Sequence, residues 1–106
     1  MAFTAILSRN GRTAVITLAG ELDALTAPAF RLEVERAAEG EVDQLVLDMT
    51  NLAYLSSAGL RGLVFARQKM PDDVRIVLVR PNDLVEQSIR LVGFHQSVVF
   101  SQHVPD

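Results

Sequence analysis

The sequence of 106 residues contains no cysteine, which excludes disulfide bonds and thiolate metal sites. It has no basic stripe either: its ten lysine and arginine residues are scattered along a chain of net charge −3, which argues against a nucleic-acid-binding face. No apolar run reaches the roughly 20 residues that a membrane-spanning helix needs, and the N-terminal segment lacks the charge order of a signal peptide. We therefore expect a cytoplasmic protein without nucleic-acid or membrane partners.

Motifs of catalysis are also missing from the sequence. It has no glycine-rich phosphate loop and no nucleophile with a base and an orienting group. His95 and His103 lie near the C-terminus without the spacing of metal ligands, and we expect them to be surface or packing residues. These absences predict a protein that is not an enzyme and that holds no cofactor or metal.

Apolar residues make up 49% of the chain, enough for a real core, and we expect residues 1–106 to form a single domain. Alternation over residues 3–8, the Asn-Gly pair at 10–11 and the apolar run at 13–20 predict a β-hairpin. Helical spacing then begins at Thr26, which we expect to cap a helix that ends at Gly40. The positions of this helix expected to face the core are Phe30, Val34 and Ala37 or Ala38.

Strands alternate with helices in the second half of the chain. Apolar runs at 45–49, 74–79 and 97–101 predict three strands. Helical spacing predicts a helix over 57–70 and another that begins at Asn82 or Asp83 and ends at Gly93. The core-facing positions expected in these two helices are Leu60, Leu63, Val64, Leu84, Val85, Ile89 and Val92. This order predicts an α/β fold: an N-terminal β-hairpin, then strand-helix units, forming a mixed sheet of about five strands with helices packed on it.

Two adjacent serines, Ser56 and Ser57, lie between the strand at 45–49 and the helix at 57–70. Open α/β sheets usually place their sites at the carboxyl edge of parallel strands, and a helix N-terminus favours anions. Two interpretations stay open: the serines cap the helix, or one hydroxyl receives a phosphate. We expect Gly59 to lie where a partner's backbone or a neighbouring strand comes close, so that its replacement harms binding more than stability.

Three segments together resemble the STAS domain family, and within it the bacterial anti-sigma-factor antagonists. They are "LAGELDALTAPAF" at 18–30, "LVLDM" at 45–49 and "NLAYLSSAGLRGL" at 51–63. The resemblance is specific because two elements occur together: "GELD" followed by "TA", and the later "SSAGL" loop. The resemblance covers about residues 3–101 and implies the same order of strands and helices as the pattern above.

The resemblance also implies which serine is modified. In the family this loop commonly reads Asp, Ser, Ser or Thr, Gly, Leu, and the serine after the Asp is phosphorylated. Alignment on the Gly-Leu pair puts Ser57 at the phosphorylated position, Ser56 at the Asp and Ala58 at the second hydroxyl. Ser57 is therefore the implied phosphoacceptor, and Ser56, which has no carboxylate, departs from the family pattern.

The partners implied by the resemblance are a serine-kinase-type anti-sigma factor and a phosphoprotein phosphatase. The anti-sigma factor binds the unphosphorylated antagonist, releases its sigma factor, and inactivates the antagonist with phosphate from ATP; the ATP and magnesium belong to the kinase. The implied partner-binding residues are Glu21, Asp23, Ser56, Ser57, Ala58, Gly59 and Arg61.

Alternatives stay open for two of these residues and for the function. Asp23 either contacts the kinase or orients the seryl hydroxyl, or it is a turn residue or alternative helix cap. Arg61 either pairs with a phosphate or a partner's acid, or is simply solvated. The alternative function is that of a STAS scaffold or accessory subunit in a stressosome-like or lipid-transport complex. A serine at the acceptor position of a free-standing domain favours the antagonist.

Overall fold

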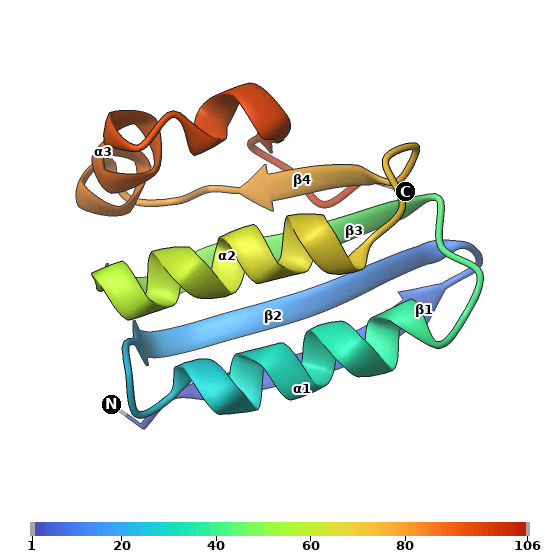
Figure 1. The fold of residues 1–106 in the computed structure, drawn as a ribbon, viewed down its shortest axis with the longest axis horizontal. Coiled ribbons are helices and arrows are strands. Elements are labelled where there is room, and N and C mark those ends of the chain that lie inside the picture. Colours follow the sequence, from blue (N-terminus) through green and yellow to red (C-terminus); the bar gives the residue numbers. More distant parts are fainter. Residues whose placement is uncertain (1, 106) are drawn as a thin grey trace.

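Five strands form one mixed sheet in the computed structural model, which describes residues 2–105 (Figure 1). Their order in the sheet is their order in the chain. β1 runs antiparallel to β2, and every later pair is parallel. The strands are β1 Thr4–Asn10, β2 Thr13–Leu22, β3 Gln44–Leu55, β4 Arg75–Val79 and β5 Val99–Ser101. The prediction of a mixed α/β sheet that begins with a hairpin is confirmed.

The hairpin turn forms where the Asn-Gly pair predicted it. Asn10 pairs with Thr13, which leaves Gly11 and Arg12 as the central turn residues. Gly11 has a φ of 61°, a left-handed conformation that glycine adopts at little cost. Arg12 forms ion pairs with Glu41 and Asp43 in the loop just before β3, and its hydrogen bond to Asp43 raises the pKa of Arg12 above the ordinary value. These contacts hold the turn against the amino end of the parallel strands.

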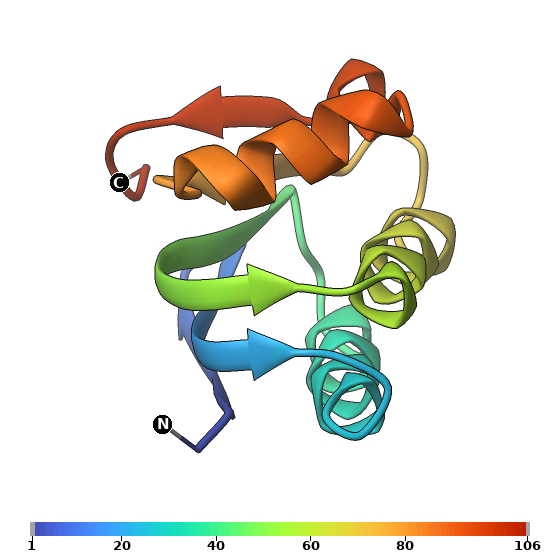
Figure 2. The same ribbon diagram turned by 90° about the vertical axis from the view of Figure 1, so that its left-hand side faces the viewer.

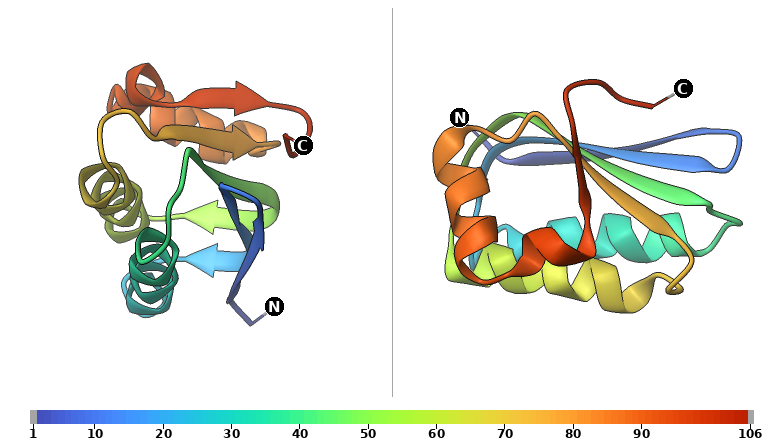
Figure 3. Two further views of the ribbon diagram at one scale, coloured as in Figure 1. Left: turned by 90° about the vertical axis from the view of Figure 1, so that its right-hand side faces the viewer. Right: turned by 90° about the horizontal axis from the view of Figure 1, so that it is seen from above.

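Helices α1 (Ala27–Ala38) and α2 (Ser57–Lys69) lie side by side across one face of the sheet (Figures 1 and 2). Helix α3 (Asp83–Leu91) and the short 3₁₀ helix η1 (Phe94–Ser97) follow β4, and α3 packs against β3 (Figure 3). One hydrophobic core fills the space between the helices and the sheet. As predicted, α1 ends just before Gly40.

Most positions expected to face the core are buried. They include Phe30, Val34 and Ala37 of α1, Leu63 of α2, and Val85 and Ile89 of α3. Three of the expectations are wrong, because Val64 is 39%, Leu84 71% and Val92 60% exposed. In α2 the buried face holds small residues beside Leu63, and these let the helix approach its neighbours closely; they are Gly59, Gly62 and Ala66. Helix α3 carries apolar residues on more than one face, and only one face meets the core.

Several element boundaries differ from the predictions. β3 continues to Leu55 rather than ending at residue 49, because its later part pairs with β2 and buries Leu52 and Leu55. β5 begins at Val99, since Ser97 belongs to η1. Helix α3 ends before Gly93, as predicted. None of the helices within residues 2–105 is long and apolar enough to span a bilayer.

Asn82 is the cap of α3 and also ties it to β3. Its Oδ1 accepts a hydrogen bond from the N–H of Val85 at 2.8 Å, and its Nδ2 donates to the carbonyl of Leu52 at 3.2 Å. We expect Asn82→Ala to lower the free energy of unfolding by about 1–3 kcal/mol in urea denaturation, because both bonds are lost. Asn82→Asp, which keeps the acceptor and loses the donor, should cost less. Equal stability of wild type and Asn82→Ala would show that the bonds contribute nothing.

Candidate functional site

The carboxyl ends of the parallel strands β2 and β3 meet at one edge of the sheet, where α1 and α2 begin (Figure 1). This is the edge at which open α/β sheets usually place their sites. The predicted site residues come from two loops there: Glu21 and Asp23 from the end of β2 and the loop after it, and Ser56 with its followers from the junction of β3 and α2.

Ser56 joins the two loops and caps α2. Its backbone N–H donates to the carbonyl of Leu22 at 3.0 Å, which fixes the end of β3 to the end of β2. Its Oγ accepts a hydrogen bond from the N–H of Gly59 at 3.2 Å, so it satisfies one of the free donors at the start of the helix. The capping interpretation of Ser56 is confirmed.

Ser57 is the first residue of α2 and is exposed to solvent. Its hydroxyl makes no hydrogen bond to any side chain or backbone group of residues 2–105. The neighbouring serine already serves as the cap, so the Ser57 hydroxyl has no structural task at this position. The structure therefore brings the two serines together with different surroundings: the Ser56 hydroxyl is engaged in the helix cap, and the Ser57 hydroxyl is exposed without a hydrogen bond to the described residues.

Gly59 is buried, and of the two expected neighbours, a partner's backbone or a strand, the structure shows the strand. A Cβ at this position would lie 2.5 Å from the carbonyl oxygen of Leu22 and 2.7 Å from Cδ1 of Leu55. The expected close approach of a neighbouring strand is thus present, and the strand is β2 of the same chain. Because the contact is internal, we expect replacement of Gly59 to lower the stability of the domain more than it affects partner binding.

Asp23 shapes the loop before α1. Its Oδ1 accepts hydrogen bonds from the N–H groups of Leu25 at 3.0 Å and Thr26 at 3.1 Å, which is the turn and helix-start role left open above. Thr26 occupies the N-cap position, but its hydroxyl makes no capping bond; it donates to the carbonyl of Glu21 at 2.8 Å instead. The prediction that Thr26 is the N-cap residue of α1 is therefore confirmed for its position, while its hydroxyl bonds within the loop and not to the helix start. Glu21 is exposed beside it.

Arg61 and Ala58 complete the set of predicted residues. Ala58 is half-buried. Arg61 is exposed one helical turn after Ser57 and forms no ion pair with the residues that the structure describes.

Exposed apolar side chains surround this edge, and the sequence analysis missed them. Leu25, in the loop after β2, is 91% exposed; Tyr54, near the end of β3, is 52% exposed; Leu84, in the first turn of α3, is 71% exposed. Tyr54 and Leu84 line a hollow of about 280 Å³ between β3 and α3. Large apolar side chains exposed together are typical of protein-binding surfaces. Leu25 could have been noticed as a leucine in the short loop between a strand and a helix, whereas helical spacing places Leu84 among the core-facing positions and gives no signal for its exposure.

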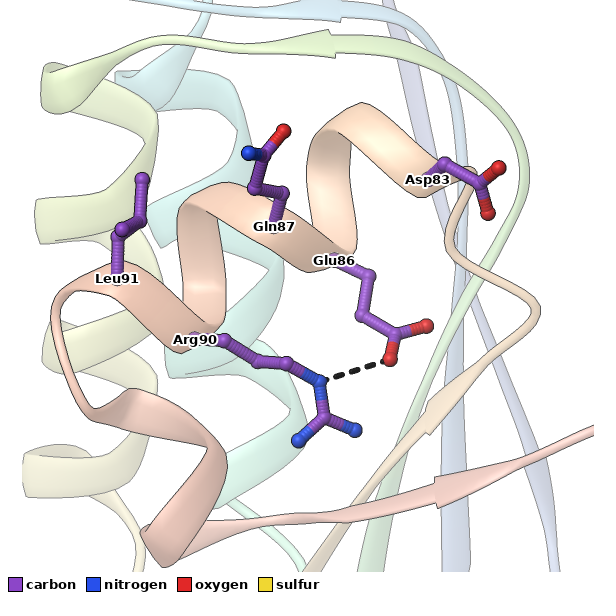
Figure 4. A pocket seen from close by; sticks show the side chains of 5 residues that line it. All are labelled: Asp83, Glu86, Gln87, Arg90 and Leu91. Atoms are coloured by element: carbon purple, nitrogen blue, oxygen red, sulfur yellow. Dashed lines mark hydrogen bonds and ion pairs between the residues drawn. The ribbon is translucent and has the colours of Figure 1, made fainter.

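A second hollow lies along α3 and offers no catalytic arrangement. Figure 4 shows Glu86 and Arg90 pointing toward each other there, with Arg90 Nε donating to Glu86 Oε2 at 2.8 Å. The Arg90 guanidinium also lies 4.8 Å from the centroid of the Phe100 ring. Within residues 2–105 no three His, Cys, Asp or Glu side chains gather to hold a metal ion. His95 is half-buried and His103 is exposed.

Comparison with known families gives a match to the STAS domain model over residues 4–106. The chain belongs to the STAS domain family. This STAS domain is 26% identical over 92 residues to the anti-sigma-F factor antagonist RsfB of Mycobacterium tuberculosis, a match that covers 87% of this chain and 75% of RsfB.

Solved structures show the same fold. The crystal structure of an anti-sigma factor antagonist from Mycobacterium paratuberculosis superposes with a TM-score of 0.88 at 21% identity, over 97% of this chain and 88% of that one. The antagonist SpoIIAA in its unphosphorylated form gives a TM-score of 0.79 at 22% identity, over 96% and 90%. The phosphorylated form of Bacillus SpoIIAA gives 0.71 at 19%, over 96% and 93%. These likenesses confirm the fold that the resemblance implied.

Gly59→Ala tests the packing at this edge, with Gly62→Ala as the matched control on the same helix. A Cβ at Gly62 would lie 3.2 Å from the side chain of Phe30, which can shift, whereas the Leu22 carbonyl that faces Gly59 is backbone. In urea unfolding we expect Gly59→Ala to lose about 1–3 kcal/mol and Gly62→Ala to change by less than about 1 kcal/mol. The packing role is refuted if Gly59→Ala is as stable as wild type.

Proposed function

We propose that this STAS domain is an anti-sigma factor antagonist switched by phosphorylation of Ser57. Unphosphorylated, it binds a serine-kinase-type anti-sigma factor and frees a sigma factor; phosphorylated, it is released, and a phosphoprotein phosphatase resets it. Membership of the family and the names of the related proteins, which are anti-sigma factor antagonists, support the binding function. The existence of a phosphorylated form of SpoIIAA supports the switch.

The observation that carries the proposal is the free hydroxyl of Ser57 on a surface suited to a protein partner. Ser56 supplies the cap, so modification of Ser57 leaves the helix start intact. Exposed Leu25, Tyr54 and Leu84 on the elements around it offer apolar contact area. A kinase bound over this edge reaches the hydroxyl without unfolding the domain.

A phosphate at Ser57 acts on the interface through its charge. It adds about −1.5 to −2 charges at the start of α2, where the helix dipole and free N–H groups favour an anion. The first turn of α2 holds no acidic residue that would repel it. The folded domain therefore tolerates the phosphate, while a partner packed over it must desolvate the new charge. Such a cost of several kcal/mol corresponds to roughly a hundredfold or more in affinity.

The remaining implied residues divide into surface contacts and supports. Glu21 and Arg61 are exposed and available to the kinase, whereas Asp23 and Gly59 hold the two loops in place. Ala58 lies beside the acceptor. In this scheme the kinase supplies ATP and magnesium, and the domain acts as a regulatory binding protein in the cytoplasm. The names of the relatives favour this function over a scaffold or transport subunit.

The test begins with the domain as bait in a pull-down from the source cell, followed by purification of the kinase-fold protein that it captures. With this kinase and ATP, wild type should gain one phosphate on Ser57, mapped by peptide fragmentation. Ser57→Ala should gain none and still bind the kinase with nearly wild-type affinity, because it loses only an exposed hydroxyl. Ser57→Asp should bind the kinase more weakly than wild type. Ser8→Ala is the control: Ser8 is exposed on β1, and its replacement should change neither phosphorylation nor binding.

Ser56→Ala separates capping from phosphorylation in the same assay. It should still be phosphorylated but lose about 0.5–2 kcal/mol of stability. Phosphate on Ser56, or full phosphorylation of Ser57→Ala, would show that the two roles are assigned to the wrong serines. Capture of no kinase-fold protein would contradict the proposed partner.

A further inference from the structure

Two arginines occupy matched positions on α1 and α2. The helices follow parallel strands, begin at the same edge of the sheet and run side by side (Figure 1). The fifth residue of each is an arginine, Arg31 in α1 and Arg61 in α2. Between the helices lies a groove of about 310 Å³, lined by Arg31, Arg61, Val64, Phe65 and Gln68, which we call the α1–α2 groove.

Neither arginine of the α1–α2 groove is neutralised by the residues that the structure describes. Three other arginines have carboxylate partners among the described residues: Arg12 pairs with Glu41 and Asp43, Arg36 with Glu33, and Arg90 with Glu86. Arg31 and Arg61 have none, and the first turns of α1 and α2 contain no acidic residue. The lining of the groove thus holds two cationic side chains and no acidic one, on a chain whose net charge is −3.

Arg31 is held in the groove with hydrogen-bonding capacity unused. It is half-buried, and its guanidinium lies over the Phe65 ring at 5.4 Å from the centroid. Its Nε is buried and has no hydrogen-bond partner within residues 2–105. Stacking on an aromatic ring fixes the plane of a guanidinium and leaves its N–H groups for a planar anion. Val64, 39% exposed, adds an apolar wall beside it.

We propose that the α1–α2 groove binds an acidic segment of the anti-sigma factor, whose carboxylates pair with Arg31 and Arg61. The inference rests on the function proposed above and names a second part of the same interface. The argument for this occupant is charge: two unpaired guanidiniums on one surface match aspartate and glutamate side chains, which arginine binds in bidentate geometry. The argument for this partner is position, because Arg61 is one turn from Ser57, so a kinase that reaches Ser57 lies over Arg61.

The groove also deepens the account of the switch. Carboxylates of the bound segment lie one helical turn from the Ser57 hydroxyl, since Arg61 follows Ser57 by four residues on α2. A phosphate on Ser57 repels these carboxylates and competes with them for Arg61. Phosphorylation therefore weakens the partner's acidic contact directly, without movement of the domain.

The test measures binding of the purified anti-sigma factor by calorimetry at low and high salt. Arg31→Gln and Arg61→Gln should each weaken binding about tenfold, and the double variant by more, because charge-assisted hydrogen bonds are lost. The salt dependence of the dissociation constant should be shallower in the double variant. Arg75→Gln is the matched control: Arg75 is exposed on β4, away from the groove, and has no ion pair among the described residues. Circular dichroism verifies that each variant is folded.

Failure of this inference is distinguishable from failure of the proposed function. If wild type binds and both groove variants bind equally well, the groove is not part of the interface and the proposed function stands. If only Arg61→Gln weakens binding and Arg31→Gln does not, the groove is not the binding site, because Arg61 alone then forms a single contact beside Ser57. If wild type itself does not bind an anti-sigma factor, the proposed function fails, and the inference fails with it. Arg61→Lys should bind more tightly than Arg61→Gln but more weakly than wild type, since the lysine ammonium lacks the planar guanidinium that binds a carboxylate in bidentate geometry.

Discussion

The hydrogen bond from the Ser56 N–H to the Leu22 carbonyl is the contact on which the site depends. It is 3.0 Å long and joins the ends of two neighbouring parallel strands. The same carbonyl lies against Gly59, where only glycine fits, so α2 starts directly on top of this junction. Because β2 and β3 are fixed together here, the loop that holds Asp23 and the first turn of α2, which begins at Ser57, form one surface.

This arrangement separates the capping serine from the one proposed to accept a phosphate. Ser56 bonds the backbone through both its N–H and its Oγ, and Ser57 presents a free hydroxyl beside it. A negative charge added to Ser57 therefore lies at a helix N-terminus that Ser56 already caps and that favours anions. The hydrophobic core is not affected. Regulation in this account is electrostatic: the phosphate changes what the surface attracts and repels. The arginines of the α1–α2 groove extend this surface along α2.

The sequence predicts those features that depend on local chemistry. The order of elements, the Asn-Gly turn and the cap by Ser56 follow from residue type and spacing, and all are present. Features set by tertiary contacts were missed. Periodicity alone does not tell which apolar face of α3 meets the core, so Leu84 was placed inward, and the continuation of β3 beyond residue 49 depends on pairing with β2. The packing role of Gly59 likewise required the position of the Leu22 carbonyl.

Amide hydrogen exchange of Ser56, followed by NMR, tests the central claim most directly. Ser56 lies outside the helices and strands, and a loop amide exposed to water exchanges rapidly. If its N–H is held by the Leu22 carbonyl in a rigid junction, it should exchange as slowly as amides of the central strand β3, before and after phosphorylation of Ser57. Rapid exchange in either state would contradict the account, because the serine would then sit on a mobile loop.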